Sequence, residues 1–471
     1  MVVGSVSRGC QVVVIGAGPG GYVAAIRAAQ LGKDVIVVEK SPRLGGVCLN
    51  VGCIPSKALI HVADLADEVR HGSAMGLTAE GLAVDLPKMV KWKDGIVRRL
   101  TGGVKFLVEK NGVEIVHGEA VFVSDRSLTV ATEEGPLEIQ FEQAIIATGS
   151  RPMELAGFDH DGETIIGSTE ALSLQDVPQR MVVIGAGYIG LELGSVYAKL
   201  GSKVSVVEFL PELVPSLDRE VAEVLEKRLK QLDVDVYLNH RAERFEAGDP
   251  GVVVAQGPDG EIRLEADVVL MSVGRVPNTD GLGLDQIGAA TDAKGFITVN
   301  DRMQTNVAGV YAVGDVVGGA LLAHKAYQEA KVAADVIAGE PAAFDSVGIP
   351  AVIYTDPEVA WVGLSESEAR EQGFEVVTGT FPFSASGRAM SLGSTDGFVK
   401  AVGDAETKRL LGVVAVGRGV SEFIGEATLG LEMGAFLEDV ALTIHPHPTM
   451  SEALQEAAEA ALGQAVHMLN T

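Results

Sequence analysis

Val13 to Gly21 reads VVIGAGPGG and Val182 to Gly190 reads VVIGAGYIG, so one glycine-rich string occurs twice, 169 residues apart (182 − 13). The match continues at the same offset, because Ala29 to Glu39 reads AQLGKDVIVVE and Ala198 to Glu208 reads AKLGSKVSVVE. In each copy an apolar strand leads into G-x-G-x-x-G, a helix follows, and a second strand ends in glutamate. This pattern is typical of a dinucleotide-binding βαβ unit, so the sequence predicts two such units.

The residue types of this fingerprint have physical reasons. The first glycine allows a tight turn, the second lets the backbone approach a pyrophosphate, and the third permits close packing of helix on strand. The helix N-terminus offers N–H groups and a positive dipole to the phosphates. The glutamate accepts hydrogen bonds from ribose hydroxyls. The predicted cofactor-binding residues are therefore Gly16, Gly18, Gly21 and Glu39 in the first copy, and Gly185, Gly187, Tyr188, Gly190 and Glu208 in the second.

Length and charge bound the class of protein. A chain of 471 residues suggests roughly three domains. The formal charge of 37 − 64 = −27 argues against nucleic acid and anionic membranes as partners, although adaptation to high salt is an alternative explanation of that charge. Gly and charged residues interrupt the apolar stretches, and Met1 to Cys10 carries no targeting pattern, so we expect a cytoplasmic protein without a membrane span. We predict no metal site.

Two cysteines stand close together in GGVCLNVGCIPSK, Gly45 to Lys57. In a regular helix, residues five apart rise by about 7.5 Å, beyond the Cα separation of a disulfide, which is about 4.4 to 6.8 Å. If Cys48 and Cys53 form a disulfide, the turn must be distorted, and Gly52 permits that. Lys57 lies four residues after Cys53 on the same helix face, where its charge lowers the thiol pKa. The alternative is a pair of inert buried thiols.

The cysteine pair also assigns the two dinucleotide sites. It follows the first βαβ unit closely, so the first site should hold the flavin that these sulfurs reduce, and NAD takes the second. Glu208 repels a 2′-phosphate, and no Arg follows it in Phe209, Leu210 or Pro211. The second site should therefore prefer NAD over NADP.

The string Gly45 to Lys57 resembles the redox-active disulfide of the pyridine nucleotide-disulfide oxidoreductases, and the likeness covers essentially the whole chain. It implies that Cys48 exchanges with substrate, that Cys53 contacts FAD, and that Lys57 beside the flavin pairs with a glutamate matching Glu192. Further matching positions are Ala120, where relatives often carry Gly at an adenine-contacting turn, Thr148 and Gly149 of an ATG turn, Gly274 and Arg275 of a VGR string, Asp315 of YAVGD, whose counterpart bonds the ribityl chain, and Ala323 of LAHK.

Near the C-terminus, TIHPHPTMSE places His447 between two prolines, and a histidine held this rigidly invites an acid–base role. Thr449-x-x-Glu452 is also a capping-box pattern, so Glu452 has the alternative role of starting the next helix. The string resembles the family's His-Pro-Thr…Glu element. That resemblance implies that His447 accepts the proton of a substrate thiol, that Glu452 orients it, and that the segment reaches into the other subunit of a homodimer.

The predicted fold class is α/β, with two Rossmann-like domains and a C-terminal α+β dimerisation domain. The predicted boundaries are an FAD-binding domain over 1–150, an NAD-binding domain over 151–277, a central segment returning to the FAD domain over 278–347, and an interface domain over 348–471.

The resemblance implies oxidation of protein-bound dihydrolipoamide with reduction of NAD. The implied partners are the lipoyl domains and acyltransferase core of 2-oxo acid dehydrogenase complexes, or the H protein of the glycine cleavage complex. Two alternatives stay open. One is another NAD-dependent flavin disulfide reductase, and the other is a non-catalytic flavoprotein subunit that docks on a multienzyme core.

Overall fold

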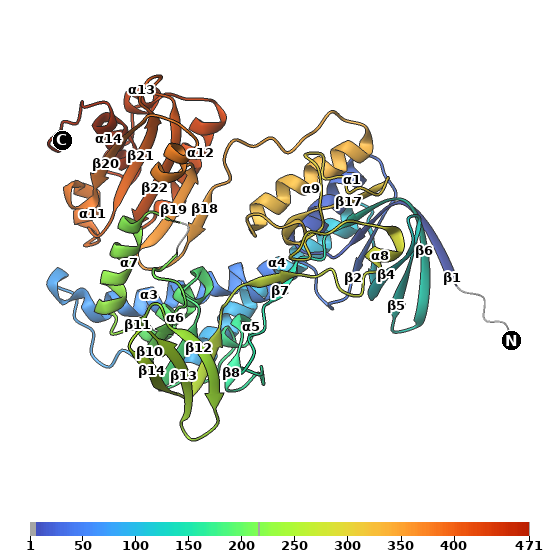
Figure 1. The fold of residues 1–471 in the computed structure, drawn as a ribbon, viewed down its shortest axis with the longest axis horizontal. Helices are drawn as coiled ribbons and strands as arrows, with labels where there is room; N and C mark the ends of the chain where they lie inside the picture. Colours follow the sequence, from blue (N-terminus) through green and yellow to red (C-terminus); the bar gives the residue numbers. More distant parts are fainter. Residues whose placement is uncertain (1–5, 215–216, 471) are drawn as a thin grey trace.

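The computed structural model describes residues 6–214 and 217–470, which form three lobes (Figure 1). The first lobe contains β1 (Val6–Ile15), β2 (Val35–Glu39), β3 (Glu114–His117), β4 (Glu119–Ser124), β5 (Ser127–Thr132), β6 (Gly135–Ile146) and β17 (Val310–Ala312). These strands form one sheet in the order β3-β2-β1-β6-β5-β4, with β17 also beside β6. The pairs that join β3, β2, β1, β6 and β17 are parallel, whereas β4, β5 and β6 form an antiparallel meander.

One face of the parallel part of this sheet packs against the meander β4–β6 and the segment that returns from the second lobe, and helices cover the other face. They are α1 (Pro19–Gln30), α2 (Gly46–Val51), α3 (Cys53–His71), α4 (Leu86–Lys110) and α9 (Ala323–Ala338). Val12, Val13 and Val14 in β1 are fully buried, as expected of a parallel strand covered on both sides. Helices α1 and α9 pack side by side, although about 300 residues separate them (323 − 19 = 304). The late segment of the chain thus completes the first lobe.

The second lobe repeats this plan. Its strands and helices are β8 (Ile165–Ile166), α5 (Ser168–Ala171), β9 (Arg180–Ile184), α6 (Tyr188–Leu200), β10 (Lys203–Val207), α7 (Arg219–Gln231), β11 (Asp235–Tyr237), β12 (Arg241–Glu246), β13 (Gly251–Gly257), β14 (Gly260–Ala266) and β15 (Val268–Met271). The parallel order β11-β10-β9-β15 matches β3-β2-β1-β6 of the first lobe, and β12-β13-β14 matches its meander. The predicted duplication of a dinucleotide-binding fold is confirmed.

The third lobe is α+β, as predicted. Its elements are β18 (Ala351–Ile353), β19 (Glu358–Gly363), α10 (Glu366–Glu371), β20 (Val376–Pro382), α11 (Gly387–Ser391), β21 (Phe398–Asp404), β22 (Leu410–Gly417), α12 (Ile424–Glu432), α13 (Leu437–Leu442) and α14 (Glu452–Ala461). The sheet is antiparallel in the order β18-β19-β22-β21-β20. Helix α14 packs directly on β20, because Gly379 has no Cβ to overlap the helix backbone at Ala461.

Two short antiparallel strands, β7 (Ser150–Pro152) and β16 (Arg275–Pro277), lie where the chain leaves and re-enters the first lobe. After β16 come α8 (Leu284–Ile287), β17 and the 3₁₀ turn η2 (Gly314–Val317). The domain boundaries at 150, 277 and 347 remain predictions, and this crossing lies at the first two of them.

One helical run departs from a sequence-based expectation. In the described ranges, 6–214 and 217–470, one helical run, Gly46–Met75, has the length and apolar composition of a helix that crosses a membrane. In its most apolar 18-residue stretch, 33% is buried inside the protein. It comprises α2, α3 and the 3₁₀ turn η1 (Gly72–Met75). Leu59 and Ala63 in this run are fully buried in a cluster shared with the second lobe. The run is apolar here because α3 packs between lobes.

Candidate active site

A cavity of 660 Å³ opens between the first sheet and α6, and it brings together residues that are far apart in the sequence. The predicted site residues that line it are Gly16, Gly18, Glu39, Cys48, Cys53, Lys57, Ala120, Thr148, Gly149, Tyr188, Glu192, Arg275, Asp315 and Ala323. The predicted residues that do not line it are Gly21, Gly185, Gly187, Gly190, Glu208, Gly274, His447 and Glu452. The cavity therefore holds the predicted flavin side of the site together with the redox cysteines.

The first glycine-rich turn has the shape that its sequence predicts. Gly16 has φ +95°, and a Cβ there would lie 2.5 Å from the carbonyl oxygen of Ala147. A Cβ at Gly21 would overlap the carbonyl oxygen of Gly16. Helix α1 begins after Gly18 with no side-chain cap and no acidic residue in its first turn. Its N–H groups are therefore free to bind a phosphate.

The glutamates that end β2 and follow β10 are held in the same way. Glu39 Oε2 accepts from the Ala17 amide (2.7 Å) and Oε1 from the Ser41 amide (2.7 Å). Glu208 Oε2 accepts from the Ala186 amide (2.7 Å) and Oε1 from the Leu210 amide (2.8 Å). Each partner is displaced by the same 169 residues. Each carboxylate is thus fixed by backbone and keeps spare lone pairs for the hydroxyls of a ribose.

These features fit an adenine dinucleotide at each site. The first turn leaves a backbone cradle that a side chain would fill, and it adjoins the cavity. At the second turn, a Cβ at Gly190 would overlap the carbonyl oxygen of Gly185, whereas a Cβ at Gly187 would meet no atom within 4 Å. Gly187 thus faces open space where the pyrophosphate of NAD would lie.

We expect Gly187→Ala to separate cofactor binding from folding. The added methyl group meets no protein atom, so the melting temperature should stay within about 2 °C of the unmodified protein. The KM for NAD should rise on the order of tenfold, because the methyl group occupies the approach to the pyrophosphate. Thermal unfolding and steady-state kinetics check this. Gly9→Ala, another site with open space, is the control and should change neither quantity.

Asp315 is positioned by contacts that the sequence did not reveal. Its Oδ2 accepts from the Ser150 hydroxyl (2.5 Å), and Arg275 Nε donates to the same hydroxyl oxygen (2.7 Å). Glu329 of α9 accepts from the Gly314 amide (2.7 Å), immediately before Asp315. Arg275, predicted as a cofactor contact, thus supports the flavin side of the cavity.

Hydrogen bonds join the ATG turn, residues 147–149, to Asn278 in the segment that returns to the first lobe. Thr148 Oγ1 donates to the carbonyl oxygen of Asn278 (2.7 Å), and Asn278 Nδ2 donates back to the carbonyl oxygen of Thr148 (2.9 Å). The Asn278 amide also donates to the Gly149 carbonyl oxygen (2.9 Å). The proton of the Thr148 hydroxyl is therefore bonded within the protein, so a cofactor contact through this side chain would use its oxygen as acceptor.

The two cysteines lie on two separate helices. Helix α2 ends at Val51, Gly52 takes a non-helical conformation (φ −141°, ψ −114°), and α3 starts at Cys53. The predicted distortion of this turn is confirmed. A hydrogen bond from Cys48, together with the charge of Lys57, lowers the pKa of Cys53 to about 7 despite burial. The same hydrogen bond, with burial, raises the pKa of Cys48. Cys53 is therefore the group that carries the thiolate.

Lys57 and Glu192 form the predicted pair. Lys57 Nζ lies 2.8 Å from Glu192 Oε2 and 4.5 Å from the ring centroid of Tyr354. The backbone amide of Tyr354 donates to Glu192 Oε1 (2.9 Å). Tyr354 belongs to the third lobe, and no sequence motif indicated it. Three lobes therefore meet at this ion pair.

Removing the Lys57 charge should raise the pH at which the Cys53 thiol loses its proton. The Cys53 thiolate forms as pH rises through the pKa, which is about 7 with Lys57 in place. Lys57→Met should raise that midpoint by about one pH unit or more, because a cation near a thiol favours the charged form. The long-wavelength absorbance of a thiolate beside the flavin, followed against pH in the reduced holoprotein, measures it. An unchanged midpoint would contradict the role given to Lys57.

His447 and Glu452 form a pair on the third lobe. His447 Nδ1 lies 2.7 Å from Glu452 Oε1, and the amide of Thr449 donates to Glu452 Oε2 (2.6 Å). One carboxylate therefore serves both alternatives, orienting the histidine and fixing the turn before α14. The His447 side chain is 79% exposed and lies outside the cavity. Within one chain, the predicted base and the cysteines are not brought together.

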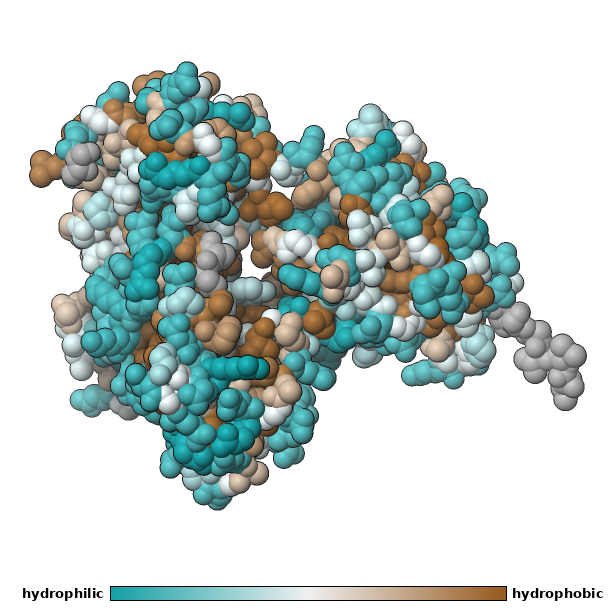
Figure 2. All heavy atoms as spheres, in the orientation of Figure 1, coloured by the Kyte–Doolittle hydropathy of each residue, from teal (hydrophilic) through white to brown (hydrophobic). Residues whose placement is uncertain are grey.

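The surface near His447 is apolar. Most of the face in Figure 2 is hydrophilic, but apolar patches lie on the third lobe. Leu442 and Ile444 are exposed beside the histidine turn, Ile444 by 95%, and Met433 at the end of α12 is exposed as well. The His445 side chain, in contrast, is buried, and its Nε2 lies 2.8 Å from Glu426 Oε1. Exposed apolar side chains of this kind are typical of a surface that another subunit covers.

Two family models match the chain. The first, Pyridine nucleotide-disulphide oxidoreductase, covers residues 10–330, and the second, the dimerisation domain of the same family, covers residues 349–458. The second match supports a homodimer. The chain is 50% identical to "Dihydrolipoyl dehydrogenase 2" of Haloarcula marismortui, over 99% of this chain and 100% of that protein, and 48% identical to "Dihydrolipoyl dehydrogenase" of Geobacillus stearothermophilus, over the whole of both.

Solved structures agree. LpdA from Mycobacterium tuberculosis has a TM-score of 0.89 at 27% identity, over 95% of this chain and 99% of that one. The HOCl-induced flavoprotein disulfide reductase RclA from Escherichia coli has a TM-score of 0.85 at 29% identity, over the same shares. With its duplicated dinucleotide fold, its cysteine pair and these matches, the chain belongs to the pyridine nucleotide-disulphide oxidoreductase family, whose members use FAD and a nicotinamide cofactor.

Proposed function

We propose that the protein oxidises dihydrolipoamide, carried on a protein, and reduces NAD. The observation that carries this proposal is the identity of 46% to 50%, over the full chain, to relatives named dihydrolipoyl dehydrogenase. The cysteine pair, Lys57–Glu192 and His447–Glu452 are all present with contacts that suit this chemistry. An intact set of reactive groups also argues against a subunit that only docks on a complex.

The reaction begins with removal of a proton from one thiol of the substrate. His447 of the partner subunit supplies the base, and Glu452 accepts from its Nδ1 so that Nε2 is left free for the substrate proton. The substrate thiolate then attacks Cys48 Sγ in the oxidised pair. The Cys48–Cys53 bond breaks, and Cys53 leaves as a thiolate.

The low pKa of Cys53 makes it the better leaving group, and the charge of Lys57 stabilises the thiolate that forms. The second substrate thiol then displaces Cys48, which releases lipoamide and leaves both cysteines reduced. Bound FAD would supply the redox chemistry that links the reduced cysteines to NAD, by accepting an electron pair and donating a hydride. Glu39 and the N-terminus of α1 would hold the flavin dinucleotide, and Glu208 and the N-terminus of α6 would hold NAD.

Glu208 should decide the choice of nicotinamide cofactor. Its carboxylate, held by two backbone amides, would face the ribose 2′ position and repel a phosphate there. Glu208→Gln removes the charge and can keep one of the two amide contacts, through its single side-chain oxygen. We expect kcat/KM for NADP relative to NAD to rise on the order of tenfold, measured by steady-state kinetics with both cofactors. An unchanged ratio would remove this assignment.

We also propose that the homodimer works in the cytoplasm as the flavoprotein component of 2-oxo acid dehydrogenase complexes or of the glycine cleavage complex. Support comes from the relatives' names and from a substrate that must be presented on a carrier protein. Pull-down with purified lipoyl domain, acyltransferase core and H protein would discriminate between these partners.

The activity itself has a direct test. Purified holoprotein should form NADH from NAD and dihydrolipoamide, and should not oxidise NADPH with glutathione disulfide. Activity with NADPH and glutathione disulfide alone would refute the proposed substrate while leaving the family assignment intact.

A further inference from the structure

Two ion pairs join α3 to α6 with the same spacing on both helices. Lys57 Nζ lies 2.8 Å from Glu192 Oε2, and Lys199 Nζ lies 2.5 Å from Asp64 Oδ1. Within each helix the two residues are seven positions apart (64 − 57 and 199 − 192), which is close to two full turns. They therefore lie on one face of each helix. The two pairs form successive rungs between α3 and α6, with the charges exchanged.

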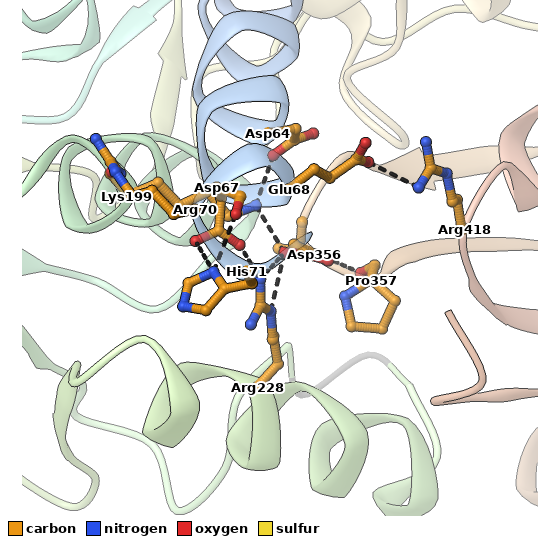
Figure 3. Close-up of polar contacts among 11 residues, drawn as sticks. Asp64, Asp67, Glu68, Arg70, His71, Lys199, Arg228, Asp356, Pro357 and Arg418 are labelled. Atoms are coloured by element: carbon orange, nitrogen blue, oxygen red, sulfur yellow. Dashed lines mark hydrogen bonds and ion pairs between the residues drawn. The ribbon is translucent and has the colours of Figure 1, made fainter. Parts of the chain in front are cut away.

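One segment of the third lobe contributes a further group to each rung. The amide of Tyr354 donates to Glu192 in the first rung (2.9 Å), and two residues later Asp356 Oδ2 lies 2.7 Å from Lys199 Nζ in the second. Figure 3 shows the Asp64, Lys199 and Asp356 side chains meeting beside α3. The segment between β18 and β19 thus spans both rungs.

The second rung contains a buried charge, the Lys199 ammonium. The Lys199 side chain is only 2% exposed, and it lies between two carboxylates. Arg228 Nη2 bridges Asp356 and Asp67, at 2.6 Å from each, and Arg70 donates to the Lys199 carbonyl oxygen (Figure 3). A buried ammonium without partners is strongly unfavourable, so this geometry permits little sliding of α3 along α6.

We propose that Asp64, Lys199 and Asp356 form a positioning cluster for the reaction: they fix the register of α3 against α6, and so hold Lys57 beside Cys53. This rests on the proposed function. Asp64 lies about three helical turns after Cys53 (64 − 53 = 11 residues), and none of the three residues lines the cavity. Because α3 begins at Cys53 and carries both Lys57 and Asp64, a shift of the second rung moves the first one with it.

The test uses two variants that weaken the second rung. Lys199→Met removes the ammonium and keeps the length of the side chain, while Asp64→Asn removes one carboxylate and leaves Lys199 paired with Asp356. Lys199→Arg is the conservative rescue. Glu68→Gln is the matched control, because Glu68 also joins α3 to the third lobe, through Arg418 (2.7 Å), but in an exposed pair with side-chain exposures of 46% and 45%.

The informative readout is the pH midpoint at which the Cys53 thiolate appears beside the flavin in the reduced holoprotein. Lys199→Met and Asp64→Asn should raise this midpoint by about 0.5 pH unit or more, since Lys57 then stabilises the thiolate less. At pH 7, a midpoint raised from about 7 to about 7.5 leaves about a quarter of Cys53 as thiolate in place of a half, so kcat should fall at least about twofold, and the KM for NAD should stay unchanged. Lys199→Arg should restore both, and Glu68→Gln should change neither.

A lowered melting temperature with an unchanged midpoint in both variants would overturn the proposal, because the cluster would then only hold lobes together. If Lys199→Met does not fold, Asp64→Asn decides by the same midpoint. The midpoint is spectroscopic and needs no lipoamide. A failure of the proposed substrate would therefore appear as missing turnover in the unmodified protein, separately from this result.

Discussion

Cys48→Ser should lower turnover of dihydrolipoamide by at least about a thousandfold, since it removes the sulfur that forms the mixed disulfide. The Cys53 thiolate should persist, because the new serine hydroxyl can donate in place of the Cys48 thiol and Lys57 still lies beside Cys53. The variant should therefore bind FAD and show the long-wavelength thiolate absorbance without reduction. Stopped-flow and steady-state assays with dihydrolipoamide and NAD measure the loss, and an absorption spectrum shows the thiolate.

Cys10 provides the matched control for this experiment. Burial raises the pKa of its thiol to about 12, and it lies in the core of the first lobe, outside the cavity. Cys10→Ser should keep full turnover and the unmodified spectrum. Normal turnover in Cys48→Ser, or equal losses in the two variants, would contradict the exchange role of Cys48.

His447→Gln should lower kcat with dihydrolipoamide by about 10²- to 10⁴-fold, the usual contribution of a positioned general base. The flavin and the cysteine pair should be unaffected, because His447 lies outside the cavity in its own chain. Reduction by excess NADH, which needs no substrate thiol, should stay normal. His445→Gln is the control, since His445 is held by Glu426 and has no assigned part in the reaction.

Mixing the two inactive variants tests whether the site is shared between subunits. In a hybrid dimer of Cys48→Ser and His447→Gln, one site combines an intact Cys48 with an intact His447 of the partner subunit. Random exchange gives half hybrids with one active site of two, so activity should recover to about a quarter of the unmodified value. No recovery, with hybrid formation shown by mass spectrometry, would mean that each chain uses its own histidine.

The fold was largely predictable because the decisive signals are local or periodic. A glycine with φ +95° at Gly16 and a glutamate that closes a strand are requirements of one βαβ unit, and the 169-residue repeat shows them twice. Composition alone does not decide the place of the run from 46 to 75, because a helix that packs between lobes can have the same apolar content as one that crosses a bilayer.

The candidate site was predictable only where a motif marks it. Cys48, Cys53 and Lys57 share one string, and Asp315 has its own. The residues that position these groups have no motif of their own: Ser150, at the start of β7, donates to Asp315, and the amide of Tyr354, in the third lobe, donates to Glu192. Such contacts depend on how lobes pack, and neither spacing nor residue type in the sequence indicates them.

The most direct measurement of the electron path is an anaerobic single turnover of the holoprotein. One equivalent of dihydrolipoamide, added without NAD, should produce the thiolate absorbance at about the rate of steady-state turnover. NAD added next should return the oxidised spectrum and yield about one equivalent of NADH. If NADH forms at the normal rate while that absorbance never appears, or if Cys48→Ser behaves identically, electrons do not pass through the Cys48–Cys53 pair, and the account is wrong.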